Sequence, residues 1–201
     1  MAYLILIRHG ITNWNVEGRW QGLTDTSINE GGKIQAKQAA QALNGIRVDI
    51  AFTSNLIRTK QTSEEICKTS GYTCPVFSNA ALNERDYGIY TGKNKWQVKK
   101  KLGEKEFQNL RRGWDYPIPK GESLKDVYGR VIPFYQQEIL GKLKQGKNIM
   151  IVSSGNTLRA LIKYLDNYTD QEILNLELNF AEVRIYNINN KGEVINREIK
   201  T

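Results

Sequence analysis

The sequence predicts an α/β fold in three layers, with a mostly parallel sheet and helices on both of its faces. Three observations predict it. Short apolar runs without polar alternation, at residues 4–7 and 149–152, are typical of strands buried on both faces. Segments with helical periodicity follow such strands, and this alternation is the pattern of a parallel sheet. With 201 residues, of which 40% are hydrophobic, the chain can form a single domain with an ordinary core.

The first third of the chain alternates between strands and helices. The strand at residues 4–7 leads into a polar loop over residues 11–27. A helix over residues 29–43 begins with an asparagine cap and carries apolar residues at helical spacing. The second strand covers residues 49–53, and a helix over residues 56–69 stops before a glycine.

The middle of the chain is less regular. Residues 82–95 form a polar and aromatic loop, and two short helices follow over residues 95–102 and 104–112. Residues 113–122 contain two prolines and form a linker. We expect residues 79–122 to form a cap over the C-terminal edge of the sheet and not a separate domain.

The last third continues the alternation and ends in a hairpin. A long helix is expected over residues 123–143, with Pro133 kinking it. The elements expected after it are a strand at 148–153, helices at 157–165 and 170–176, and strands at 183–188 and 194–199. An Asn-Asn-Lys-Gly stretch between the last two strands predicts the hairpin turn.

Composition argues against several classes of protein. The net charge is +8, but no basic run interleaved with aromatics resembles a nucleic-acid module, so we favour a small anionic ligand over nucleic acid. No apolar stretch approaches the length of a membrane span and no signal peptide is recognisable, which predicts a cytoplasmic protein without membrane contact. With one histidine and two isolated cysteines, we expect neither a disulfide framework nor a metal site.

The first strand runs directly into Arg8, His9 and Gly10. Functional residues of an open α/β sheet collect at the C-terminal ends of its strands, and Gly10 lets the backbone approach a ligand. His9 is the only histidine of the chain. A lone histidine is most often structural, but an imidazole beside a guanidinium after a buried strand is costly unless an anion or a chemical role accounts for it. The pair favours phosphoryl transfer, with His9 attacking phosphorus and Arg8 stabilising the oxygens.

Further motifs resemble the histidine phosphatase superfamily, also called the phosphoglycerate mutase-like family. The resemblance covers nearly the whole chain, in order, at residues 8–10, 14–15, 22, 54–59, 82–88, 91–95, 111–112, 117–119, 121–126 and 155–159. The two motifs within residues 82–95 resemble the cofactor-dependent phosphoglycerate mutases more than the generic phosphatases. The linker before residue 121 is shorter than in the longer mutases.

The resemblance implies roles for individual residues. His9 would become phosphorylated, Arg8 and Arg58 would hold the phosphoryl group, and Glu84 would be the general acid and base. The substrate-binding residues implied are Asn15, Gln21, Gly22, Arg58, Tyr87, Lys95, Arg111, Arg112, Gly155 and Asn156. Two plainer interpretations stay open: Glu84 in an ordinary salt bridge, and the arginine pair on a solvated helix end. Adjacent helical residues do not share one face, so both arginines reach one ligand only if the helix terminus points at it.

Ser154 is the largest departure from the family pattern. In the family a second histidine stands at this position and adds charge and a hydrogen bond to the phosphoryl group. Serine offers a hydroxyl without the charge, and losing one such donor commonly costs about 3 kcal/mol, roughly a hundredfold to a thousandfold in rate. Ser154 is either natural, giving a weak enzyme or a pseudoenzyme, or an engineered substitution. Ile11 and Thr12 also differ from the Glu-Ser pair that is usual after the first motif.

The function implied by the resemblance is the interconversion of 3-phosphoglycerate and 2-phosphoglycerate through a phosphohistidine. 2,3-Bisphosphoglycerate would prime the enzyme, and no metal would be needed. One alternative is a phosphatase of the same superfamily, and the other is a non-catalytic protein that binds a phosphorylated metabolite. The distal residues Tyr87 and Lys95, with the arginine pair, favour the mutase, whereas Ser154 suggests the non-catalytic protein. The oligomeric state is left open.

Overall fold

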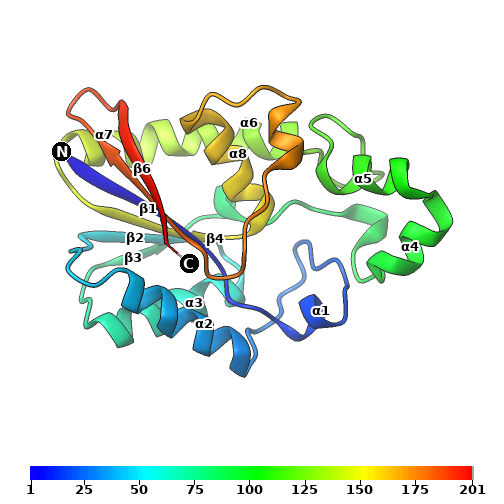
Figure 1. Ribbon diagram of the computed structural model, residues 1–201, viewed down its shortest axis with the longest axis horizontal. Helices are drawn as coiled ribbons and strands as arrows, with labels where there is room; N and C mark the ends of the chain where they lie inside the picture. The colour runs from blue at the N-terminus through cyan, green and yellow to red at the C-terminus, as the bar shows by residue number, and fades with distance from the viewer. Residues whose placement is uncertain (201) are drawn as a thin grey trace.

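The computed structural model describes residues 1–200 and shows a six-stranded mixed sheet between two layers of helices (Figure 1). The strands, in the order in which they lie across the sheet, are β3 (Val76–Ser78), β2 (Ile50–Thr53), β4 (Ile149–Ser153), β1 (Ala2–Arg8), β5 (Val183–Ile188) and β6 (Val194–Lys200). The first four are mutually parallel, and β5 and β6 are antiparallel to their neighbours. The expected α/β class with a mostly parallel sheet is confirmed.

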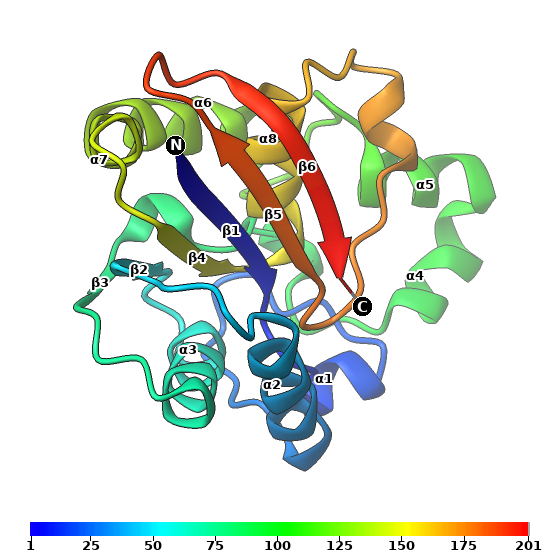
Figure 2. The same ribbon diagram turned by 60° about the vertical axis from the view of Figure 1, so that its left-hand side comes forward.

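Helices cover both faces of the sheet (Figure 2). One face packs against α2 (Glu30–Ala42) and α3 (Ile57–Ser70), and the other against α6 (Leu124–Phe134), α7 (Leu140–Lys144) and α8 (Gly155–Leu165). The central strand β1 is buried on both faces because its side chains alternate between the two apolar cores. No helix within residues 1–200 is long and apolar enough to cross a membrane.

Most element boundaries follow the local signals in the sequence. The side chain of Asn29 accepts a hydrogen bond from the Gly32 amide and caps α2, and Gly71 ends α3 in the left-handed conformation. Two short elements depart from the expectation. Helix α1 (Asn13–Val16) lies inside the predicted loop, where a capping box at Thr12 supports a single turn. Strand β3 has only three residues, all exposed, and so carries no burial pattern that predicts it.

The long helix expected over residues 123–143 is interrupted. Ser123 caps α6 through a capping box, but a π-helical turn, η3 (Tyr135–Ile139), separates α6 from α7. The irregular turn begins two residues after Pro133, which lies inside α6 and lacks a backbone donor. The helix expected over residues 170–176 is only a short 3₁₀ helix, η4 (Glu172–Asn175).

The segment between β3 and α6 lies beyond the carboxyl ends of the parallel strands, at the right of Figure 1. Its elements are η1 (Ala80–Leu82), η2 (Gly88–Tyr90), α4 (Lys95–Leu102) and α5 (Glu104–Arg112). Helices α4 and α5 pack, together with Trp20 from the loop after β1, in an apolar cluster separate from the two cores of the sheet: Trp20, Tyr87, Val98, Phe107, Leu110 and Ile118. This separate packing holds α4 and α5 over the edge of the sheet where the first motif ends.

The register between β1 and β4 brings two sequence motifs together. Arg8 pairs with Ser153, and the amide of His9 donates to the Ser153 carbonyl at 2.9 Å. His9 and Ser154 therefore follow adjacent strand ends. Beyond His9 the backbone packs tightly on α2, because a Cβ on Gly10 would lie 2.5 Å from the carbonyl oxygen of Gly32. This close approach sets the direction in which the chain leaves the strand.

Candidate active site

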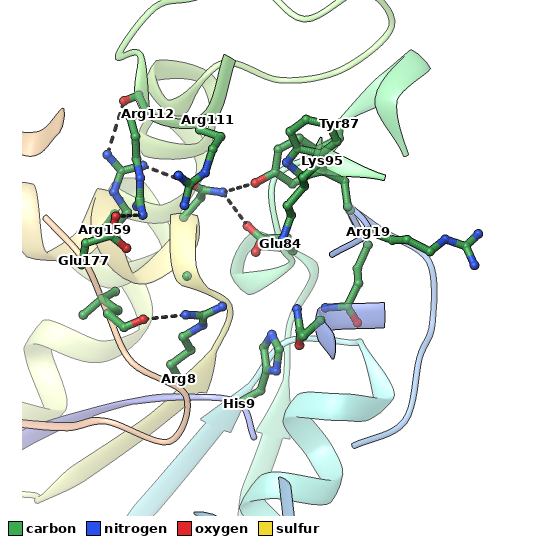
Figure 3. Close-up of a pocket in the computed structure, with 17 residues that line it drawn as sticks. Arg8, His9, Arg19, Glu84, Tyr87, Lys95, Arg111, Arg112, Arg159 and Glu177 are labelled. Atoms are coloured by element: carbon green, nitrogen blue, oxygen red, sulfur yellow. Dashed lines mark hydrogen bonds and ion pairs between the residues drawn. The ribbon is translucent and has the colours of Figure 1, made fainter. Parts of the chain in front are cut away.

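A pocket opens between the carboxyl ends of β1 and β4 and the overlying α4 and α5 (Figure 3). Twelve of the residues predicted from the sequence line it: Arg8, His9, Asn15, Gln21, Gly22, Glu84, Tyr87, Lys95, Arg111, Arg112, Gly155 and Asn156. They come from widely separated parts of the chain. The fold thus collects most of the predicted constellation in one place.

His9 is held as a neutral imidazole with one nitrogen free. The side chain is 2% exposed, and Nδ1 lies 2.8 Å from the carbonyl oxygen of Gly10. A carbonyl only accepts, so Nδ1 carries the hydrogen and Nε2 keeps its lone pair. Burial, together with the guanidinium groups of Arg58 and Arg8, holds the pKa of His9 well below its ordinary value. A neutral Nε2 is the form that can attack an electrophile.

Arg8 places a cation beside His9. Its Nη1 donates to the carbonyl of Leu178 at 2.5 Å, and its guanidinium carbon lies 3.8 Å from the centroid of the Phe180 ring. Burial lowers the pKa of Arg8 to about 10, so the group remains charged at neutral pH. Its Nε is buried without a partner among the described residues. Arg8 therefore retains a donor that an anionic ligand could satisfy.

A hydrogen-bonded chain orients Glu84 and Tyr87. Nη1 of Arg159 donates to Oδ1 of Asn156 at 2.9 Å, and the Nδ2 group of Asn156 donates to the Tyr87 hydroxyl at 2.9 Å and to Oε1 of Glu84 at 3.3 Å. Because arginine cannot accept, Arg159 dictates which way the Asn156 amide faces. The Tyr87 hydroxyl thus accepts from Asn156 and can donate its own hydrogen to a ligand.

Oε1 of Glu84 also accepts from the Arg85 amide at 2.7 Å, in addition to the Asn156 contact. The second carboxylate oxygen is therefore the one available for proton exchange with a ligand. No arginine or lysine forms an ion pair with Glu84 among residues 1–200. The structure does not support the plainer interpretation of Glu84 as an ordinary salt bridge.

The far end of the pocket is formed by the C-terminus of α5. The buried Arg85 donates from Nη2 to the carbonyls of Leu110 at 2.9 Å and Arg111 at 3.2 Å, which satisfies the end of the helix. Both Arg111 and Arg112 then line the pocket, because the helix terminus points at it. Lys95 joins them from the first turn of α4, and burial lowers its pKa.

Two predicted residues stand behind the pocket wall. Arg58 is fully buried, and it donates to the carbonyls of Gly22 at 2.8 Å and Thr24 at 2.9 Å. It orders the turn that carries Gly22, and it does not line the pocket in this structure. Ser154 is also fully buried, at the start of α8, and its Oγ has no hydrogen-bond partner among the described residues. Direct contact of either residue with a phosphoryl group remains a prediction.

Five lining residues were not among those predicted: Arg19, Trp20, Arg159, Glu177 and Leu178. Arg159 ends one of the recognised motifs, and this position could have signalled it. Glu177 and Leu178 lie in the loop before β5, and no local pattern in the sequence points to them. Six cationic side chains and two carboxylates line the pocket, which suits a ligand with several negative charges. Within residues 1–200 no three histidine, cysteine, aspartate or glutamate side chains are grouped to hold a metal ion.

Comparison with known protein families and sequences gives a consistent result. The family model of the histidine phosphatase superfamily (branch 1) matches residues 4–200. A 2,3-bisphosphoglycerate-dependent phosphoglycerate mutase of Rhodopseudomonas palustris is 40% identical over 197 residues, which cover 96% of this chain and 95% of that protein. The protein of the same name from Parvibaculum lavamentivorans is 36% identical over 199 residues, covering 98% of this chain and 95% of that protein.

Solved structures show the same fold. A mycobacterial glucosyl-3-phosphoglycerate phosphatase in complex with VO3 superposes with a TM-score of 0.85 at 23% identity, over 100% of this chain and 98% of that chain. A phosphoserine phosphatase from Entamoeba histolytica, in complex with 3-phosphoglyceric acid, gives a TM-score of 0.81 at 25% identity, over 100% of this chain and 98% of that chain. The fold is that of these phosphatases.

The protonation of His9 can be tested directly by nuclear magnetic resonance. As the only histidine, it gives a single imidazole spectrum that needs no assignment. Because its pKa lies well below the ordinary 6.5, the ligand-free ring should stay neutral as the pH falls from about 7.5 to about 5.5, with the hydrogen on Nδ1. Nitrogen-15 shifts of the two ring atoms measure this. A titration midpoint at or above the ordinary value, or a hydrogen on Nε2, would contradict the assignment.

Proposed function

The chain belongs to branch 1 of the histidine phosphatase superfamily, and we propose that it is a phosphoglycerate mutase acting through a phosphohistidine at His9. The observation that carries the proposal is that one pocket holds both the nucleophile and a distal group of cations. Arg8 and His9 lie at one end of this pocket, Lys95, Arg111 and Arg112 line the other, and Glu84 lies between them beside Tyr87. A phosphatase needs the first set, whereas a mutase must also hold the rest of the substrate during two transfers.

The first transfer would phosphorylate His9. The lone pair of Nε2 attacks phosphorus, the bond between phosphorus and the ester oxygen breaks, and the departing oxygen takes a proton from Glu84. Arg8 stabilises the negative charge that spreads over the transferring oxygens. With 2,3-bisphosphoglycerate as the phosphoryl donor, this step primes the protein and leaves a monophosphoglycerate in the pocket.

The second transfer reverses these roles. Glu84, now a carboxylate, takes the proton of the substrate hydroxyl as the oxygen attacks the phosphorus on His9, and the bond to Nε2 breaks. The Tyr87 hydroxyl, Lys95 and the arginine pair would hold the carboxylate and second phosphate, so that either hydroxyl can face His9 in turn. Guanidinium groups suit this task because their paired donors match carboxylate and phosphate oxygens.

The relatives support a mutase over a phosphatase. Proteins named 2,3-bisphosphoglycerate-dependent phosphoglycerate mutase match this chain at 36–40% identity over nearly its full length. Under the same mechanism, a phosphatase would pass the phosphoryl group from His9 to water. The two functions therefore differ in the acceptor and not in the nucleophile, and they can be separated by products.

A coupled assay distinguishes the candidate functions. We expect conversion of 3-phosphoglycerate to 2-phosphoglycerate that is strongly stimulated by added 2,3-bisphosphoglycerate and absent in the His9→Ala variant. Release of inorganic phosphate is measured in the same samples. Phosphate release without isomerisation would identify a phosphatase instead, and ligand binding with neither product would identify a non-catalytic protein.

We also propose that Ser154 occupies the position of the second active-site histidine of the superfamily and limits the rate of phosphoryl transfer. Ser154 is the N-cap residue of α8, and the pairing of β1 with β4 supports the proposal because Ser154 and His9 follow adjacent strand ends. The unpartnered Oγ offers no charge to a phosphoryl group. A histidine at this position would add a cationic donor where the transition state spreads negative charge over three oxygens.

The Ser154→His variant tests this role. Its turnover number should rise by roughly two to three orders of magnitude, with a smaller change in the Michaelis constant, because the added donor acts most strongly in the transition state. Both proteins are measured at saturating 2,3-bisphosphoglycerate, after circular dichroism shows equal folding. A folded variant that is no faster would mean that another residue supplies the missing charge, or that the protein is not a mutase.

A further inference from the structure

Glu177 is a carboxylate in a pocket otherwise suited to anions. Apart from Glu84, it is the only acidic side chain that lines the pocket among the described residues. It lies in the loop before β5, and the proposed chemistry gives it no task. A negative charge here opposes the binding of a phosphorylated acid, so its presence needs an explanation of its own.

Glu177 forms an ion pair with Nη2 of Arg112, and Nη1 of Arg112 donates to the carbonyl of Leu176 at 3.2 Å. The next residue of the loop, Leu178, is bound through its carbonyl to Arg8. The backbone on both sides of Glu177 is therefore tied to arginines of the pocket. Its side chain is 69% exposed, whereas that of Arg112 is 16% exposed, so the carboxylate can turn into solvent while the loop stays in place.

Glu177 also compensates the charge of two neighbouring arginines. Burial lowers the pKa of Arg112 and lowers that of Arg159 to about 9, and the Glu177 carboxylate acts in the opposite direction on both groups. Figure 3 shows Glu177 beside these two arginines, on the side of the pocket away from Lys95. A bound anion at Arg112 would provide the same compensation. An anionic ligand and Glu177 can therefore each pair with Arg112, in place of the other.

We propose that Glu177 is a specificity-determining residue that competes with the distal anionic group of the substrate for Arg112. The assignment of Arg112 to that distal group rests on the proposed function. Because of this competition, the pocket prefers ligands with a distal carboxylate less strongly than it would without Glu177. The difference in affinity between a phosphoglycerate and a phosphate ester with a neutral distal group, such as glycerol 3-phosphate, is therefore smaller than it would be without Glu177.

A matched pair of ligands separates this role from a merely structural one. 3-Phosphoglycerate and glycerol 3-phosphate share a three-carbon skeleton and a phosphate, and they differ in a carboxylate against a hydroxymethyl group. If Glu177 only held the loop in place, its loss would change the binding of both ligands alike. If it competes for Arg112, only the carboxylate ligand should respond.

The experiment measures dissociation constants by calorimetry in a His9→Ala background, where no phosphoryl transfer occurs. Glu177→Gln should lower the dissociation constant of 3-phosphoglycerate by about three- to fivefold and leave that of glycerol 3-phosphate unchanged. The expected factor corresponds to the free energy of a partly exposed ion pair. Glu177→Asp keeps the charge and should stay nearer to the parent. The control is Glu138→Gln, because Glu138 pairs with Lys142 outside the pocket.

Equal changes for the two ligands, no change, or weaker binding of 3-phosphoglycerate by Glu177→Gln would each overturn the role of Glu177. Failure of the parent protein to bind either ester would instead overturn the proposed function, and the inference with it. Because binding is measured without turnover, the result for Glu177 does not depend on whether the protein isomerises or hydrolyses its ligand.

Discussion

The parallel pairing of β1 with β4 is the constraint on which the site depends. It brings His9 and the residues that begin α8 to one edge of the sheet, although about 145 positions separate them in the chain. Asn156, in the first turn of α8, then reaches Glu84 and Tyr87 from the segment above. A shift of one residue in this register would turn every side chain of the shifted strand to the opposite face of the sheet and separate His9 from these partners.

Burial of charge links the fold to the chemistry. Arg8, Arg58 and Arg159 are buried, and each keeps an Nε without a partner among the described residues. A buried donor without a partner is costly, and for Arg8 and Arg159, which line the pocket, an anionic ligand could offset that cost. Burial, together with Arg58 and Arg8, holds the pKa of His9 well below its ordinary value. In the proposed mechanism, the same surroundings that suit an anion thus preserve the lone pair on His9. In our proposals, both Ser154 and Glu177 reduce the positive charge available to a ligand: Ser154 because it stands where the family has a histidine, and Glu177 because it pairs with Arg112.

The sequence predicted the parts of the fold that local signals determine. Continuous apolar runs located β1 and β4, and Asn29 and Gly71 marked helix ends through their own backbone preferences. The three exposed residues of β3 carry no such signal and were not predicted. Pro133 predicted a kink in the long helix, but not the π-helical form of the turn η3 that follows it. The site shows the same division. Motif residues such as His9 and Glu84 were predicted, whereas Glu177 reaches Arg112 only because a loop distant in sequence crosses the pocket.

If His9 is the phosphorylated nucleophile, the protein should form a phosphohistidine that can be detected. After incubation with 2,3-bisphosphoglycerate, mass spectrometry of the intact protein and its peptides should show one phosphoryl group on His9. The label should be acid-labile and absent in His9→Ala, and it should form slowly if Ser154 has the role that we propose. An acid-stable phosphoserine elsewhere, with His9 unmodified, would contradict this account of the site.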